Sequence, residues 1–182
     1  MVIRNLGLDP DKDVTYLAVG GTMSRLAALG TGKVHAAPIS QVVVPIAEER
    51  GLNIMQIESI PFIIDALWTS RKYADENPQV VQNVVRAYTR AIAVLVKDRD
   101  KSLEVLRKYM RTSDPRVIQN GYDRYREELD RVPIPSEKAI KNTVEISNRV
   151  APKLAGIDIK RYLYFAPVQR LAEEGFIDRL YK

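Results

Sequence analysis

The chain has 182 residues, of which 46% are hydrophobic and 28% charged, a composition typical of a globular protein with one core or two small lobes. It contains no cysteine and one histidine. Disulfides, thiolate catalysis and clusters of Cys or His metal ligands are therefore excluded, and we expect no cofactor or metal. The net charge of +5 is spread over interspersed basic and acidic residues, so we expect a solvated surface and no nucleic-acid partner. No apolar run is long enough to cross a membrane, and the first residues lack the apolar core of a signal peptide.

The front of the chain alternates between short apolar runs and short helical patterns. Strands are predicted at residues 14–19, 34–39 and 53–57, with helices between them at 22–29 and 40–51. Two strands joined by so short a helix imply a parallel crossover, since an antiparallel pair would need only a hairpin. We therefore expect a βαβαβ lobe and an α/β fold.

The rest of the chain is predicted to be mainly helical after one more extended run at 66–70. Asn77 and Pro78 form a helix start signal, and a valine-rich face follows over residues 78–97. Further helical segments are expected near residues 101–110, 115–129, 136–150, 158–162 and 167–174.

The turn after the first predicted strand is the candidate ligand site. Gly20 and Gly21 leave the backbone bare there, and a helix that begins at Thr22 offers unpaired N–H groups, including that of Met23. We interpret this turn as one that accepts an anion or a polar ligand. Trp68, in the fourth extended run, either belongs to the core or lines a cleft.

Other motifs do not support an enzyme. Gly30-x-Gly32-Lys33 lacks the further residues of a phosphate-binding loop, because Ala27 and Val34 stand where that motif needs glycine and Ser or Thr. The Gly20–Thr22 turn also lacks the full dinucleotide fingerprint. His35 could be drawn into a catalytic triad, but no serine lies in a nucleophile-elbow sequence.

The chain carries a series of short motifs, which are Gly7-Leu8-Asp9-Pro10-x-Lys12-Asp13-Val14, Val19-Gly20-Gly21-Thr22-x-x-Arg25-Leu26-Ala27-Ala28-Leu29, Gly32-Lys33-Val34-His35-Ala36-Ala37, Ala47-Glu48-Glu49-x-Gly51, Thr69-Ser70-Arg71-x-Tyr73 and Glu76-Asn77-Pro78. In this order and spacing they resemble the type II periplasmic substrate-binding proteins of ABC importers. Within them the chain is most similar to the nitrate/sulfonate/taurine and thiamine-precursor (NMT1/THI5-like) group. His35 stands where this family usually has an acidic residue.

This resemblance implies a periplasmic-binding-protein-like II fold with a ligand between two α/β lobes. Residues 1–64 would form a near-complete second lobe, and residues 65–182 the crossing strand and a helical remainder of the first. The opening strands and helices of the first lobe are not in this sequence, so a truncated form is expected. The implied ligand-binding residues are Gly20, Gly21, Thr22, Met23, Ser40 and Trp68.

The implied function is that of a non-enzymatic, extracytoplasmic solute-binding component of an ABC importer, with a permease as its partner. If the chain is truly this short, a cytoplasmic location is expected instead. The solute would be a small anion or heteroaromatic molecule, such as a sulfonate, nitrate or a thiamine precursor. One alternative is a pyrimidine-precursor synthase of the same fold, which the absence of cysteine and the single histidine disfavour. Another is a remnant or interaction protein without a transport role. Because the helix at 78–97 and the run at 66–70 would lack sheet neighbours, a homo-oligomer is also expected.

Overall fold

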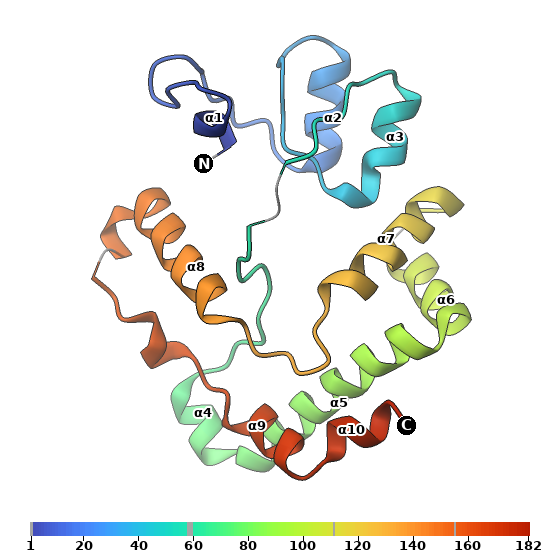
Figure 1. The fold of residues 1–182 in the computed structure, drawn as a ribbon, viewed down its shortest axis with the longest axis vertical. Helices are drawn as coiled ribbons and strands as arrows, with labels where there is room; N and C mark the ends of the chain where they lie inside the picture. Colours follow the sequence, from blue (N-terminus) through green and yellow to red (C-terminus); the bar gives the residue numbers. More distant parts are fainter. Residues whose placement is uncertain (1, 58–59, 111, 155) are drawn as a thin grey trace. The chain divides into compact units, whose positions relative to one another are not determined.

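The computed structural model describes residues 2–57, 60–110, 112–154 and 156–182, and helices make up about 60% of the chain (Figure 1). The helices are α1 (Val2–Asn5), α2 (Thr22–Gly30), η1 (Gln41–Val43), α3 (Val44–Glu49), α4 (Arg71–Glu76), α5 (Pro78–Lys97), α6 (Arg99–Tyr109), α7 (Pro115–Glu128), α8 (Glu137–Val150), η2 (Pro152–Leu154), η3 (Ile159–Tyr162), α9 (Ala166–Glu173) and α10 (Phe176–Leu180). The chain forms two compact units, which comprise residues 1–58 with 105–124, and 59–104 with 125–182.

The predicted α/β fold with its βαβαβ lobe is wrong, because the described residues contain no strand. All four predicted strands are irregular coil, and none of their described side chains is buried; Leu17 (55%), Met55 (58%) and Trp68 (84%) are exposed. Alternating apolar residues are a local signal, whereas a strand exists only through hydrogen bonds to a neighbour. Within the described residues these runs have no such neighbour.

In the first unit, part of α7 packs against η1 and α3. Asn120 donates a side-chain hydrogen bond to the carbonyl of Gln41, and Gly121 lies against the side chains of Met110 and Val42. The buried face of α7 includes Val117, Ile118 and Tyr122. Residues 105–124 thus add buried side chains to the first unit, in which Leu26 of α2 and Ala47 of α3 are also fully buried.

In the second unit, α5 packs against α9 and α10. Val168, Leu171 and Ile177 form a buried cluster there. Polar contacts tie the same helices together, because the Gln82 side chain donates to the carbonyl of Pro167 at 2.9 Å and the Lys97 ammonium donates to that of Leu180 at 3.1 Å. The C-terminal helices therefore cover one face of α5.

A coil segment before α4 lies along α8 in this unit. The N–H of Ile63 donates to the hydroxyl of Thr143 at 3.0 Å, and the side chain of Asn142 donates to the carbonyl of Pro61 at 2.9 Å. Ser70, which the sequence places at the end of a strand, is instead the N-cap of α4 and accepts from the N–H of Tyr73 at 3.1 Å.

The helical half of the prediction is largely confirmed. The helix predicted at 78–97 has the same bounds in the structure, and those near 101–110, 115–129 and 136–150 differ by a few residues at most. The short helices α4 and α10 were not predicted.

No helix in the described residues is both long and apolar enough to span a membrane. The expected division into residues 1–64 and 65–182 stays a prediction.

Candidate functional site

The chain passes from coil into α2 at Gly20 and Gly21, and backbone N–H groups at this point have no hydrogen-bond acceptor within the described residues. Gly20 has a φ of +89°, which favours glycine, and Gly21 is the N-cap of α2 in an extended conformation. The carbonyl of Gly21 accepts the first helical bond, from the N–H of Arg25 at 3.0 Å, and no side chain caps the helix. Within the described residues the N–H groups of Thr22 and Met23 have no acceptor. These groups are the orphan donors of a helix start, which carry partial positive charge.

Arg25 holds this turn in place. Its Nε donates to the carbonyl of Gly20 at 2.9 Å, and its Nη1 donates to the carbonyl of Pro38 at 3.2 Å. One guanidinium therefore joins the turn to the coil that follows α2, and it adds a full positive charge beside the carbonyl of Gly20. The planar fork of arginine suits such a double contact, whereas lysine offers only a point charge.

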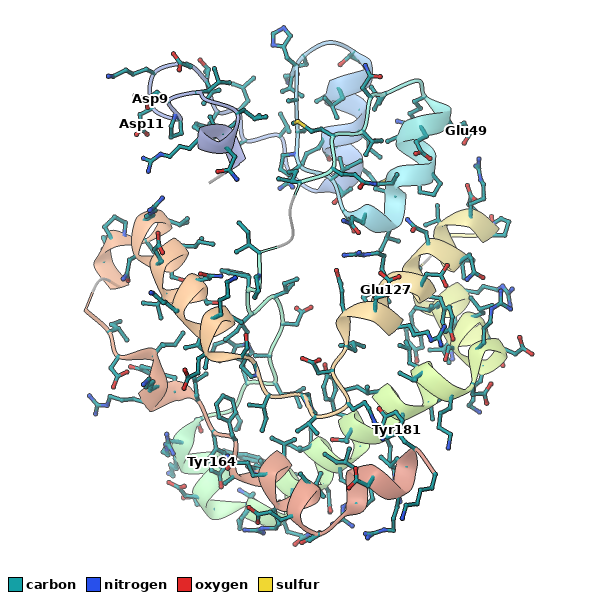
Figure 2. The ribbon with its side chains drawn as sticks, viewed as in Figure 1. Asp9, Asp11, Glu49, Glu127, Tyr164 and Tyr181 are labelled. Atoms are coloured by element: carbon teal, nitrogen blue, oxygen red, sulfur yellow. The ribbon has the colours of Figure 1, made fainter. Side chains whose placement is uncertain are left out.

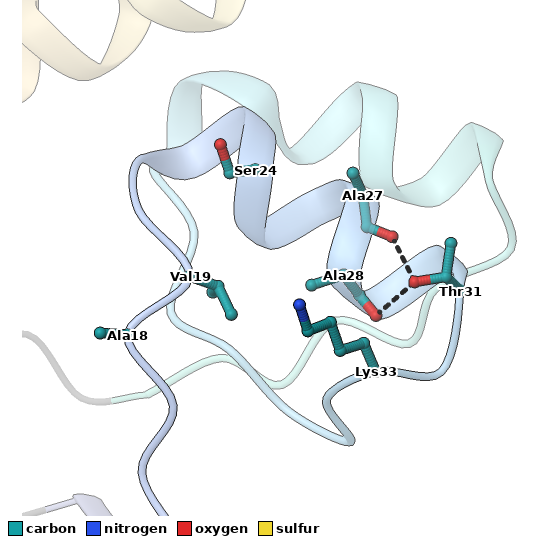
Figure 3. A pocket seen from close by; sticks show the side chains of 7 residues that line it. All are labelled: Ala18, Val19, Ser24, Ala27, Ala28, Thr31 and Lys33. Atoms are coloured by element: carbon teal, nitrogen blue, oxygen red, sulfur yellow. Dashed lines mark hydrogen bonds between the residues drawn. The ribbon is translucent and has the colours of Figure 1, made fainter.

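A shallow pocket of about 530 Å³ lies along one face of α2 (Figure 3). Its lining is mostly apolar, and it is made by Ala18, Val19, Ser24, Ala27, Ala28, Thr31 and Lys33. The Lys33 ammonium points between Val19 and Ala28 (Figure 3), and within the described residues it has no ion pair or hydrogen bond. The volume falls within the range of small-molecule sites.

Ser24 connects this pocket to the glycine turn. Its side chain lines the pocket and lies 3.6 Å from where a Cβ on Gly20 would be. At the other end of the pocket, the Thr31 hydroxyl donates to the carbonyls of Ala27 and Ala28 and so closes the C-terminus of α2 (Figure 3). Ser24 is thus the side chain common to the turn and the pocket, with positive charge at Arg25 beside the turn and at Lys33 in the pocket.

The structure brings together some of the predicted site residues and not others. Gly20, Gly21, Thr22 and Met23 form the turn itself. Ser40 is exposed and is the N-cap of η1, two residues after Pro38, which Arg25 contacts.

Trp68 belongs to the other unit and is 84% exposed, so the structure does not join it to the turn. His35 is also exposed. The analysis of the sequence assigned no site role to Arg25 or Lys33. The available signal for Arg25 was its fixed place in the Gly20-Gly21-Thr22-x-x-Arg25 motif.

A second charged group in this unit is structural. Arg116 donates to both carboxylate oxygens of Asp114, with Nη2 at 2.7 Å, and to Glu49 at 2.8 Å. Glu49 lies on α3 and is labelled in Figure 2. The hydrogen bond from Arg116 lowers the pKa of Asp114 to about 2. The charges of Asp114, Arg116 and Glu49 compensate one another, and the ion pair between Arg116 and Glu49 links α7 to α3. Among the described residues, no group of His, Asp and Glu is arranged to hold a metal ion.

Comparison with known proteins gives one family. A family model described as NMT1/THI5 like matches residues 1–102, which is more than half of the chain and includes the turn, Arg25 and the pocket. No curated protein and no solved structure matches the chain.

Proposed function

Because the chain belongs to the NMT1/THI5-like family, we propose that it is a solute-binding protein whose ligand is received at the Gly20–Met23 turn. The observation that carries this proposal is the start of α2, where N–H groups without an acceptor in the described residues open beside a mostly apolar pocket. The solute we propose is a small anion or heteroaromatic molecule, such as a sulfonate, nitrate or a thiamine precursor.

The chemistry of the turn supports an anionic group on the solute. The N–H groups at the start of a nine-residue helix attract negative charge, and the guanidinium of Arg25 adds to the same field. The apolar body of the solute would lie in the pocket against Val19 and Ala28, beside the ammonium of Lys33, which points between them. Ser40 and Trp68 are proposed as further contacts.

We further propose that the protein serves an ABC importer outside the cytoplasm, with residues 1–64 and 65–182 acting as the two parts that close on the solute. On this proposal the chain is not an enzyme.

A pyrimidine-precursor synthase would need chemistry at His35, which lies exposed in coil. A turnover screen with thiamine-precursor substrates decides between the two, because product formation abolished by His35→Ala would contradict the binding role.

The sharpest test of the turn is Gly21→Asp. Gly21 already has the φ of −74° and ψ of 179° of an N-cap, and a Cβ there meets nothing within 4 Å. An aspartate would cap the open N–H groups and stabilise α2 by about 0.5–1 kcal/mol. It would also occupy the anion position and repel an anion. We therefore expect a more stable protein that binds its solute at least tenfold more weakly.

The measurement is isothermal titration with nitrate, sulfate, taurine and a hydroxymethylpyrimidine, together with a urea unfolding curve. Asn53→Asp is the matched control, because it adds the same charge at an exposed coil position of the same unit. Binding that is weakened by Gly21→Asp and kept by the control supports the proposal. Binding that survives Gly21→Asp unchanged contradicts it.

A further inference from the structure

The loop that ends α2 is a Schellman motif, and it places Lys33 against the pocket. The N–H of Gly32 donates to the carbonyl of Leu29 at 3.0 Å, and the N–H of Lys33 donates to that of Ala28 at 2.9 Å. Gly32 has the positive φ (+69°) that this motif needs after the last helical turn. The residue at the position of Lys33 is often apolar and packs back on the helix. Here that position holds a cation, whose ammonium points between Val19 and Ala28 in a mostly apolar lining (Figure 3).

Helix capping does not account for this lysine. A cation near the end of a helix can donate to the last carbonyls, but several of those in α2 already have donors. The carbonyl of Ala27 accepts from both the N–H and the hydroxyl of Thr31, and the carbonyls of Ala28 and Leu29 accept from the loop. Within the described residues the Lys33 ammonium itself makes no hydrogen bond or ion pair. Its charge is therefore left for a group that enters the pocket.

The sequence around the pocket supplies cations but no carboxylate to balance them. Between Val14 and Ala47 it contains no Asp or Glu, whereas Arg25 and Lys33 both lie in this stretch. Every residue that lines the pocket belongs to the same stretch. Arg25 donates to two neutral backbone carbonyls, and these contacts leave its charge uncompensated. One positive charge thus lies beside the turn and another in the pocket, and a solute with two negative groups complements both.

We infer that Lys33 determines the charge of the solute inside the pocket, and that this solute is a dianion with one acidic group at the turn and a second beside the Lys33 ammonium. The inference rests on the proposed function and narrows it. An amine in place of the second acidic group would be repelled, so a zwitterion such as taurine fits less well. Because Lys33 is exposed, its charge is screened by water. Two unit charges about 4 Å apart in water change an affinity by about fivefold.

Isothermal titration with three sulfonates at neutral pH tests the inference, because the three differ mainly in the charge of the end away from the sulfonate. Sulfopropionate ends in a carboxylate, propanesulfonate in a methyl group and taurine in an amine. We expect the wild type to bind sulfopropionate about fivefold more tightly than propanesulfonate, and taurine more weakly than propanesulfonate by a similar factor. Lys33→Gln should remove most of this preference. Lys33→Glu should reverse it, so that taurine binds more tightly than sulfopropionate.

Lys108→Glu is the matched control, because it makes the same change of charge at an exposed position of the same unit that does not line the pocket. It should keep the wild-type order of affinities, and circular dichroism checks that all three variants keep their helices. Equal affinities for the three sulfonates in the wild type, or an order that Lys33→Glu leaves unchanged, would overturn the inference and leave the proposed function standing. An order that Lys108→Glu changes as much as Lys33→Glu would do the same. If none of the three binds the wild type, the proposed function fails and this inference fails with it.

Discussion

The two glycines of the turn should respond in different ways to the same substitution. Gly20 has a φ of +89°, a conformation that side chains disfavour by about 1–2 kcal/mol. An added Cβ would meet only the Ser24 side chain, at 3.6 Å, which is an ordinary contact. The whole expected cost of Gly20→Ala is therefore conformational, about 1–2 kcal/mol. At Gly21 the backbone is extended and a Cβ would meet nothing within 4 Å, so alanine fits without strain. Alanine lowers the entropy of the unfolded chain, which stabilises the protein, but it is a poorer N-cap than glycine, and the two effects offset each other. Gly21→Ala should change stability by no more than about 0.5 kcal/mol.

Hydrogen exchange followed by mass spectrometry measures this difference locally. A loss of 1–2 kcal/mol corresponds to roughly 5–30-fold faster exchange of the amides in α2. Gly20→Ala should show that increase in peptides that cover α2, and Gly21→Ala should not, while peptides from α5 in the other unit stay unchanged in both. Equal rates in the two variants would mean that Gly20 does not have a positive φ, and the description of the turn would then be wrong.

Substitutions at three further positions test the contacts around the turn, the core of the second unit and the ion pair between Asp114 and Arg116. Arg25→Gln should speed exchange of the first hydrogen-bonded amide of α2, that of residue 25, several-fold, and Arg25→Lys should not restore the wild-type rate, because lysine lacks the planar fork. Leu171→Ala, at a fully buried position, should lower the free energy of unfolding by about 2–5 kcal/mol in urea titrations followed by circular dichroism. Because the pKa of Asp114 is lowered to about 2, its contribution to stability is complete above about pH 4 and is lost as the pH falls towards 2. The stability difference between wild type and Asp114→Asn should therefore shrink over that range in acid titrations, and a difference independent of pH would refute the role of the carboxylate.

The sequence predicts helices well in this chain because their signals are local. Asn77 and Pro78 mark the start of α5, as predicted, and the cap of α8 is equally local, since Ser136 accepts from the N–H of Ala139 three residues on. The strand prediction failed for the opposite reason. An apolar run such as 14–19 has strand character in its composition, but only a paired neighbour makes it a strand.

The same distinction applies to the candidate site, whose local features could be predicted from the sequence and whose long-range contacts could not. The turn at Gly20 and Gly21 and the helix start after it are contiguous in sequence, so they could be predicted. The contact of Arg25 with the carbonyl of Pro38 spans 13 residues, and the pocket combines side chains from the coil before α2, the helix and the loop after it. Their convergence depends on the path of the chain, which no periodicity in the sequence encodes.

The packing of α5 against α9 and α10 has a consequence for how the protein is made. Helix α5 ends at Lys97 and α9 begins at Ala166, so the ribosome adds roughly 70 residues between them. At about 5–20 residues per second, α5 leaves the ribosome several seconds before the helices that cover it. During that interval Ile92 and the rest of the later core face are open to solvent and to other nascent chains. The second unit can therefore finish folding only after α9 and α10 have been synthesised, and chaperones that bind exposed apolar helices have time to act on it.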